Sequence, residues 1–281
     1  MRNFEGKVAA ITGAGSGLGR ALALGPAPPG WSAALSDVDE DGPADTARQV
    51  RAAGGQACTA RIDVADPAAV QAWAEACRSR HARVNLLFNN AGVALAAPAD
   101  TVRPEGFAWV MDVNFWGVVH GTQAFLPHLR ASGEGHVVNI SSVFGLMAMP
   151  TQSAYNASKF AVRGYTEALR MELELEGAPV SATCVHPGGV ATNIANAQRI
   201  AADAQRLTGL DAAAQRARAR ALVDRTAPDE AGRQVLAGVR RNARRVLVGA
   251  DARMGDAMVR LLATTYQPLL LRSLRRLKGK A

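Results

Sequence analysis

The feature that most constrains the fold is a short apolar strand followed by a glycine-rich turn and the start of a helix. The apolar run covers residues 8–11, the turn is Thr12-Gly-Ala-Gly-Ser-Gly-Leu-Gly19, and the helical segment starts at Arg20. Backbone N–H groups at such a turn, together with the dipole of the helix, bind anions. Three glycines there allow a tight turn, close approach of a pyrophosphate to the backbone, and packing of helix on strand. The sequence therefore predicts a pyrophosphate site formed by Gly13, Ser16, Gly17, Leu18 and Gly19.

Strands and helical segments alternate along the rest of the chain, which is the pattern of βαβ units in a parallel sheet. The proline-rich residues 25–30 should end the first helix near Leu24, because proline inside a helix removes a hydrogen-bond donor. The further strands are expected at residues 31–36, 57–62, 84–88, 136–142, 180–185 and 245–249. The further helices are expected at residues 43–53, 67–80, 104–130 and 153–177, with Asp66 and Ser153 as caps. This predicts an α/β fold of about seven strands in residues 1–251, followed by a C-terminal helix and basic tail at 252–281.

Tyr155 and Lys159 are four residues apart, and on a helix this spacing places both side chains on one face. A free tyrosine has a pKa of about 10, so it is a weak base at neutral pH. A lysine ammonium one turn away favours the phenolate and lowers that pKa, so the pair is a candidate general acid and base. Ser142 stands thirteen residues before Tyr155 at the end of an apolar strand, where open α/β sheets bind their ligands. The segment Asn89-Asn-Ala-Gly92 follows another apolar strand.

Together these segments resemble the short-chain dehydrogenase/reductase family, from about residue 4 to about residue 251. The glycine turn, N-N-A-G, the strand-end serine, Y-x-x-x-K and a later Pro187-Gly188 occur in the family's order. The resemblance implies a Rossmann-like, doubly wound parallel sheet, a nicotinamide cofactor, and hydride transfer to or from a carbonyl carbon. It also implies four catalytic residues: Tyr155 passes the proton, Ser142 holds the substrate oxygen, Lys159 holds the nicotinamide ribose, and Asn114 supports a water against the lysine.

The residue after the second strand predicts which nicotinamide cofactor binds. Asp37 stands there, and a carboxylate at this position accepts both ribose hydroxyls of an adenosine and repels a 2′-phosphate. The next residue is Val38 rather than an arginine, and the nearest cation, Arg20, is expected to face solvent. The prediction is therefore NAD. The resemblance adds these cofactor-binding residues: Asp63, Val64, Asn90, Gly92, Tyr155, Lys159, Pro187, Gly188 and Thr192. His186, directly before Pro187, is interpreted as having no catalytic role, because the tyrosine already has it.

Residues near the expected substrate pocket are nearly all apolar: Val143, Phe144, Leu146, Met147, Met149, Val190 and residues 94–97. This composition favours a lipophilic alcohol or ketone as substrate, and ordinary core packing explains the same residues equally well. Residues 193–224 are rich in Ala and Arg and are expected to form a helical lid that closes over the pocket. Substrate identity and the physiological direction of the reaction stay open.

The net charge of +8 is distributed unevenly along the chain. Residues 211–281 hold 16 Lys+Arg and 6 Asp+Glu, so the first 210 residues are close to neutral. Nucleic-acid binding is not expected, because the basic region lacks interleaved aromatic residues or a recognised motif. Residues 266–280 mix leucines with five basic residues and contain no acid. Such a segment either lies on an anionic membrane surface or packs on a neighbouring subunit, and subunit packing is the favoured interpretation.

The three cysteines, Cys58, Cys77 and Cys184, are widely spaced and form no C-x-x-C pair, so neither a disulfide framework nor a metal site is expected. Reduced thiols and the absence of room for a signal peptide predict a cytoplasmic protein. The resemblance implies a homodimer or homotetramer paired through the helices at residues 104–130 and 153–177. Gly117, Gly121, Ala157 and Ala161 are the small residues expected at that contact. A different hypothesis is a cofactor-binding scaffold or regulator with little turnover, although such a protein would not need all four catalytic residues.

Overall fold

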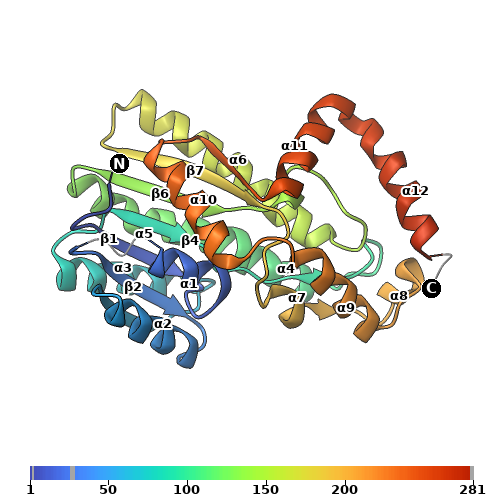
Figure 1. The fold of residues 1–281 in the computed structure, drawn as a ribbon, viewed down its shortest axis with the longest axis horizontal. Helices are drawn as coiled ribbons and strands as arrows, with labels where there is room; N and C mark the ends of the chain where they lie inside the picture. The colour runs from blue at the N-terminus through green and yellow to red at the C-terminus, as the bar shows by residue number, and fades with distance from the viewer. Residues whose placement is uncertain (2, 26–28, 279–281) are drawn as a thin grey trace.

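One seven-stranded parallel sheet forms the centre of the computed structural model, which describes residues 1, 3–25 and 29–278 (Figure 1). Its strands lie in the order β3-β2-β1-β4-β6-β7-β9, and every neighbouring pair is parallel. The strands are β1 (Val8–Thr12), β2 (Ser32–Asp37), β3 (Gln56–Arg61), β4 (Leu86–Asn89), β6 (Gly135–Ile140), β7 (Val180–Pro187) and β9 (Arg245–Val248). The order reverses between β1 and β4, which confirms the predicted Rossmann-like, doubly wound α/β fold.

Helices cover both faces of the sheet and bury its apolar side chains. On one face lie α1 (Gly17–Leu24), α2 (Asp41–Ala52) and α10 (Pro228–Arg240), around a core that includes Ile11, Phe88 and Val185. On the other face lie α3 (Pro67–His81), α5 (Gly117–Ala131) and α6 (Ser153–Leu175), around Trp73, Phe125 and Leu173. The central strands β1 and β4 are buried on both faces, which is why they read as continuous apolar runs.

Most expected elements are present, with ends that differ by one or two residues. The first helix ends at Leu24 as predicted, while Pro26 and Pro28 lie outside the described residues. Asp66 caps α3 as predicted, because its carboxylate accepts hydrogen bonds from the N–H groups of Ala68 and Ala69. The prediction for Ser153 was wrong: it is the first residue of α6 rather than its cap, and its hydroxyl has no partner among the described residues. Helix α10 was not predicted.

The long helix expected at residues 104–130 is interrupted. Helix α4 (Pro104–Met111) is followed by a π-helical turn, η1 (Asp112–Trp116), before α5 begins at Gly117. Asn114 lies in the middle of this π-helical turn and is fully buried. The widened turn places Asn114 toward the end of the sheet where the strands finish. Turns of this kind occur frequently at functional sites.

The segment expected as a helical lid consists of several short pieces. They are α7 (Ile194–Ala197), the strand β8 (Arg199–Ile200), α8 (Ala204–Thr208) and α9 (Ala212–Val223). Strand β8 pairs in parallel with β5 (Leu95–Ala96), which was not predicted either. The Arg199 guanidinium lies 3.6 Å from the Trp109 ring centroid on α4, and Arg206 bonds both carboxylate oxygens of Asp100. This side of the lid is therefore attached to the α4 region.

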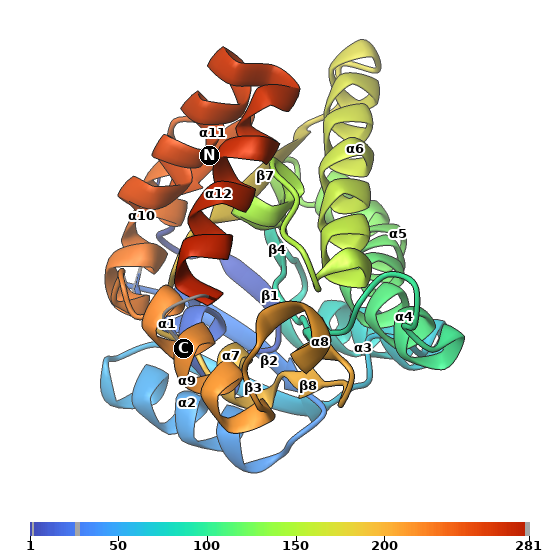
Figure 2. The same cartoon turned by 90° about the vertical axis from the view of Figure 1, so that its right-hand side faces the viewer.

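The last part of the chain forms an arm on one side of the molecule. Helix α11 (Ala250–Leu262), a short 3₁₀ turn, η3 (Ala263–Thr265), and α12 (Tyr266–Lys278) make up this arm. Figures 1 and 2 show α12 running toward the lid at the end of the sheet where the strands finish, with its C-terminal end near α8. Among the described residues, no helix has the length and apolar character needed to cross a membrane. A short 3₁₀ turn, η2 (Val143–Gly145), follows β6 and completes the elements.

Candidate functional site

The glycine turn between β1 and α1 has the geometry of an anion site. Gly17 has a φ of +52°, a conformation that strongly favours glycine, and it starts α1. A Cβ atom on Gly19 would collide with the carbonyl oxygen of Gly13, so the helix can pack on the turn only because this residue is glycine. Ser16 is the N-cap of α1, but its exposed side chain does not bond the N–H groups of the first turn. Those N–H groups, with Leu18 buried behind them, remain free to bind a phosphate.

Asn90 holds the glycine turn against the end of β4. Its side-chain amide donates to the carbonyl oxygens of Thr12 and Gly13, at 2.9 and 3.0 Å. The backbone N–H groups of Asn90 and Ala91 both donate to the Thr12 hydroxyl, at 2.9 and 3.0 Å. Asn90 therefore fixes the shape of the site through the backbone. The sequence assigned it only a contact with the cofactor.

Asp37 lies at the end of β2 beside the same turn. Its carboxylate accepts hydrogen bonds from the N–H groups of Gly15 at 3.0 Å and Val38 at 2.8 Å. Arg20 does not simply face solvent, as the sequence suggested. Its guanidinium donates to the Gly15 carbonyl at 2.7 Å and the Thr46 hydroxyl at 3.1 Å, and it pairs with Asp45 at 3.1 Å. The nearest cation is therefore already neutralised.

The loop after β7 approaches the glycine turn from the other side. The Thr192 methyl carbon lies 2.8 Å from where a Cβ atom on Gly17 would stand, so the two residues pack directly. The loop itself is held by Asp251, whose carboxylate accepts the Gly189 N–H at 2.6 Å. The same carboxylate fills the space that a side chain at residue 188 would need. Pro187 ends β7 immediately before this loop. The predicted residues Gly17, Pro187, Gly188 and Thr192 are thus brought together.

Asp63 and Val64 lie beyond β3, on the side of the site formed by η1 and α5. Asp63 is exposed, and its carboxylate accepts the Ala65 N–H at 2.9 Å. Val64 is buried against Gly117, and its carbonyl oxygen lies 3.0 Å from Nδ1 of His120. The expectation that Gly117 and Gly121 face a neighbouring subunit is wrong. A Cβ atom on Gly117 would lie 2.7 Å from Val64, and one on Gly121 would collide with Asn89, so both glycines face the interior.

Ser142 follows β6, and its side chain lies on the opposite face from that of Ser141. The Ser142 hydroxyl accepts the Phe144 N–H at 3.1 Å, and as a hydrogen-bonding neighbour it lowers the pKa of Tyr155, which burial raises. The Ser141 hydroxyl instead donates to the Lys159 carbonyl at 2.7 Å and is buried. Of the two serines, only Ser142 therefore reaches the tyrosine, as strand alternation requires.

Tyr155 and Lys159 lie one turn apart on α6, and both respond to burial. The Lys159 ammonium lies 5.6 Å from the Tyr155 ring centroid and donates to the Ile140 carbonyl at 3.0 Å. Burial lowers the pKa of Lys159 to about 8. Burial also raises the pKa of Tyr155, and the hydrogen bond from Ser142 opposes that rise. The expected lowering of the tyrosine pKa by the lysine is therefore not seen. A lysine that readily loses its proton favours the phenolate less than a permanent cation does.

Asn114 and Gly92 complete this side of the site. The Asn114 side chain accepts the Val93 N–H at 2.8 Å and donates to the Val93 carbonyl and the Ser158 hydroxyl, at 3.0 and 3.1 Å. A Cβ atom on Gly92 would lie 3.3 Å from Asn114 Oδ1 and 3.5 Å from Lys159 Nζ. A side chain at residue 92 would thus occupy the space between the amide and the ammonium. That small space suits a polar ligand group.

His186 lies behind Ser142 rather than among the acid–base groups. It is fully buried, with Nδ1 2.9 Å from the Ser142 carbonyl oxygen, and burial lowers its pKa to about 4. It therefore stays neutral, in line with the interpretation that it is not a catalytic base. Of the apolar residues expected near the substrate, Leu95 and Ala97 pack in a small core with Val110 and Ala154, and Val190 belongs to the main core. Val143 and Phe144 remain partly exposed.

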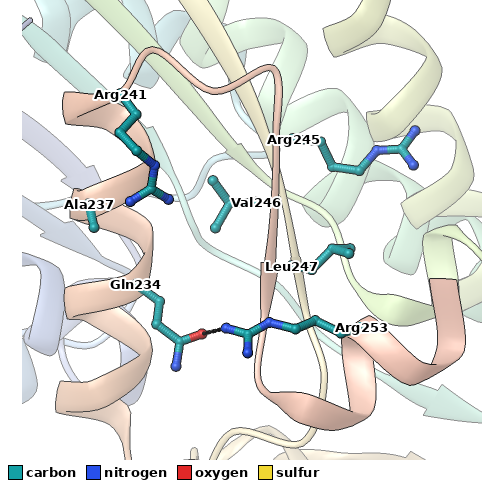
Figure 3. Close-up of a pocket in the computed structure, with 7 residues that line it drawn as sticks. All are labelled: Gln234, Ala237, Arg241, Arg245, Val246, Leu247 and Arg253. Atoms are coloured by element: carbon teal, nitrogen blue, oxygen red, sulfur yellow. Dashed lines mark hydrogen bonds between the residues drawn. The ribbon is translucent and has the colours of Figure 1, made fainter. Parts of the chain in front are cut away.

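A cleft of about 430 Å³ lies elsewhere, at the outer edge of the sheet. It is formed by α10, β9 and the start of α11, and Figure 3 shows the Arg241 side chain pointing toward Val246 and the Arg253 side chain reaching across to Gln234. Its lining residues are Gln234, Ala237, Arg241, Arg245, Val246, Leu247 and Arg253. None of these residues belongs to the glycine turn or to the Ser142–Tyr155–Lys159 group, so the cleft is separate from the candidate site.

The sequence matches the model of a known protein family over the part of the chain that contains most of the fold and the motifs described above. The family model described as short chain dehydrogenase matches residues 7–203. The chain belongs to the short-chain dehydrogenase/reductase family. The curated relatives of this family member include a putative oxidoreductase, SadH, of Mycobacterium tuberculosis. That protein is 46% identical over 274 residues, and the match covers 96% of each chain.

Solved structures of the family agree with this assignment. A short-chain dehydrogenase/reductase from Burkholderia phymatum in complex with NAD is 34% identical, with a TM-score of 0.80 over 98% of this chain and 94% of that one. Levodione reductase is 28% identical, with a TM-score of 0.77 over 89% of this chain and 99% of that one. This short-chain dehydrogenase/reductase is therefore an oxidoreductase with the nucleotide-binding Rossmann fold.

Three residues that shape the site in this family member were not identified from the sequence. Thr12 was read only as part of the glycine motif, yet its hydroxyl joins β1 to the end of β4. Asp251 was read as the end of the domain, yet it holds the loop after β7. Tyr266 was read as part of the tail, yet it is buried and its hydroxyl accepts the Ala148 N–H. Each acts through a contact more than sixty residues away along the chain, which a motif does not record.

Proposed function

We propose that this protein transfers a hydride between NAD and an apolar alcohol or ketone, with Tyr155 as the general acid and base. The observation that carries the proposal is the meeting of Ser142, Tyr155 and Lys159 beside the glycine turn, at the carboxyl ends of the strands. That edge, at the point where the strand order reverses, is where sheets of this kind bind dinucleotides.

The residues present fit a dinucleotide. The first turn of α1 offers N–H groups that no side chain caps, which suits a pyrophosphate. Asp37 places a carboxylate beside that turn, which suits an adenosine ribose and disfavours a 2′-phosphate. Arg20, the cation that could neutralise a 2′-phosphate, is already bonded to Asp45, Thr46 and the Gly15 carbonyl. These contacts support NAD over NADP, and the NAD-bound Burkholderia relative agrees with this preference.

The proposed chemistry gives each of the chain's own residues a separate role. When bound, the nicotinamide supplies the hydride acceptor or donor. In the direction of oxidation, Tyr155 first gives up its own proton, and the phenolate then takes the hydroxyl proton of the substrate while Ser142 donates a hydrogen bond to the substrate oxygen. Lys159, with a pKa lowered to about 8, can pass a proton on near neutral pH. A Cβ atom on Gly92 would lie 3.3 Å from Asn114 Oδ1 and 3.5 Å from Lys159 Nζ. Asn114 is therefore close enough to Lys159 for a water molecule to bridge their side chains.

The deciding experiment is a turnover screen of lipophilic alcohols and ketones with NAD and with NADP, for the unmodified protein and for Tyr155→Phe. Tyr155→Phe keeps the ring and removes the proton, so turnover should fall by a factor on the order of 10²–10⁴. Binding of reduced NAD, followed by its fluorescence, should stay near normal. Lys159→Ala should reduce both.

The matched control is Tyr165→Phe, which alters another tyrosine of α6 that packs against Phe115. This control should turn over substrate at the normal rate. Normal turnover by Tyr155→Phe would disprove the assigned role. Tight NAD binding with no turnover across the whole screen would instead favour the scaffold or regulator hypothesis.

A further inference from the structure

Two basic helices from separate parts of the chain lie at the same end of the molecule. Helix α9 contains three arginines and no acid, and α12 contains three arginines, one lysine and no acid. In Figures 1 and 2, α12 runs down toward the lid on the side of the sheet where the strands finish, and its C-terminal end comes close to α8, which precedes α9. We infer that the face formed by α8, α9 and α12, called here the basic face, docks on an anionic lipid surface.

The arginines that α9 and α12 contribute to the basic face are not neutralised by carboxylates of the described side chains. Within the described side chains, no carboxylate pairs with Arg216, Arg218 or Arg220 of α9, or with Arg272 or Arg275 of α12. Several arginines of the main body differ, since Arg163, Arg170 and Arg245 each pair with a glutamate. Two basic helices with unpaired arginines at one end of the molecule repel each other, and an anionic partner relieves that repulsion.

Apolar side chains accompany these cations and are exposed. No residue of α9 is buried, and Leu222 on that helix is 48% exposed. Leu269 and Leu271 on α12 are 48% and 40% exposed, and Leu207 on α8 is 44% exposed. Leucines together with arginines on surface helices are typical of segments that lie in the lipid interface, with the apolar side chains among the acyl chains and the guanidinium groups at the phosphates.

The charge of the basic face selects lipid over the other occupants. A second copy of the same face would bring the unpaired arginines of α9 and α12 against one another, which is unfavourable. A soluble acidic protein would satisfy the arginines but would not account for leucines exposed along all three helices. An anionic bilayer satisfies both, because each Lys or Arg near its surface adds to binding and the apolar side chains insert.

The basic face lies close to the candidate substrate site. The arm carrying α12 contacts the segment after Ser142, since Tyr266 bonds Ala148 and Gly255 lies against Val143 and Met147. A docked protein would thus hold its candidate site close to the lipid. Delivery of an apolar substrate from the bilayer rests on the proposed function, whereas docking itself does not.

The test is sedimentation of the full-length protein with vesicles of phosphatidylcholine alone, or of phosphatidylcholine with phosphatidylserine, at low and at physiological salt. The protein should sediment with the anionic vesicles only, and less so at higher salt. Arg272→Ala with Arg275→Ala, and separately Arg216→Ala with Arg220→Ala, should weaken binding on the order of fivefold for each arginine removed. Leu269→Ser with Leu271→Ser should weaken it at both salt concentrations.

The control is Arg78→Ala with Arg241→Ala, which removes two exposed arginines where strands β4 and β9 begin, at the other end of the sheet. This variant, and Tyr155→Phe, should bind vesicles like the unmodified protein. The inference fails if the protein stays in the supernatant at low salt, or if the control loses as much binding as the α12 variant. It also fails if the α12 variant dissociates an oligomer, since the partner would then be a protein.

Discussion

The hydroxyl of Tyr266 accepts a hydrogen bond from the backbone N–H of Ala148 at 3.0 Å, which joins the C-terminal arm to the segment after Ser142. Tyr266 is only 6% exposed, although it starts a helix whose other described side chains are all at least partly exposed. Gly255 of α11 supports the same segment, because a Cβ atom there would lie 2.9 Å from Val143 and 3.4 Å from Met147. The arm is therefore part of the support of the candidate substrate site.

We expect Tyr266→Phe to raise KM for substrate more than it lowers kcat. The variant keeps the buried ring and removes only the acceptor of the Ala148 N–H, whose hydrogen bond is worth about 0.5–1.5 kcal/mol. A rise in KM of about two- to tenfold follows if the segment after Ser142 contacts the substrate. Steady-state kinetics with a substrate found in the screen measure the effect. Equal losses in kcat and kcat/KM would instead mean that the contact stabilises only the transition state.

Cofactor preference should depend on Asp37. Asp37→Ala removes the carboxylate beside the glycine turn, so NAD binding should weaken by about 10- to 100-fold, the value of hydrogen bonds to a charged group. NADP binding should weaken much less, so the difference between the affinities for NAD and NADP should become smaller. Asp39→Ala is the matched control, because this neighbouring carboxylate bonds the Asp41 N–H and not the turn. Titration of both cofactors by calorimetry decides the point, and tighter binding of NADP to the unmodified protein would contradict the assignment.

The sequence predicted the parts of the site that depend on local residue type. The glycine turn, the choice of Ser142 over Ser141 and the strand order of a doubly wound sheet follow from steric, alternation and family rules, and the structure has all three. Gly117 and Gly121 show the limit of such rules. Their small size was recognised, but whether they meet Val64 and Asn89 or another subunit depends on how the helix is rotated. Periodicity did not settle that rotation, because the π-helical turn at Asp112–Trp116 shifts it.

The lid and the arm were predicted least well. Residues 193–224 have the composition of a helix, yet β8 forms there because Leu95 and Ala96 present a free strand edge to Arg199 and Ile200. The role of Tyr266 likewise depends on a partner 118 residues away. Tertiary contacts of this kind override local propensity. They also explain why the raised pKa of Tyr155 was missed: spacing shows that Lys159 is near, but not how deeply both groups are buried.

In the protein without cofactor, Tyr155 should titrate above the ordinary tyrosine pKa of 10, because burial raises the pKa of its hydroxyl. Ser142→Ala should raise that pKa further, since it removes the hydrogen bond that stabilises the phenolate. Tyrosinate absorbance across the alkaline range measures both, with Tyr155→Phe subtracted to assign the signal. Titration of Tyr155 near neutral pH in the cofactor-free protein would show that Lys159 outweighs burial.

Folding stability should fall below about pH 6.5, because two buried histidines resist protonation. His136 lies 2.8 Å from the Thr183 hydroxyl, and burial lowers its pKa from 6.5 to about 3. Burial likewise lowers the pKa of His186 to about 4. Between pH 6.5 and these values the unfolded chain binds protons that the folded chain does not, so the free energy of unfolding decreases as pH falls. Each histidine contributes a slope of up to about 1.4 kcal/mol per pH unit.

His136→Gln provides the test of this linkage, because glutamine keeps a polar side chain beside Thr183 and does not titrate. The variant should be less stable near neutral pH, yet its free energy of unfolding should fall less steeply between pH 6.5 and 4. The expected difference in slope is about 1.4 kcal/mol per pH unit, the contribution of one proton. Urea unfolding at a series of pH values measures both proteins. Parallel curves would mean that His136 takes up its proton equally in the folded and unfolded chains, and that acid unfolding has another origin.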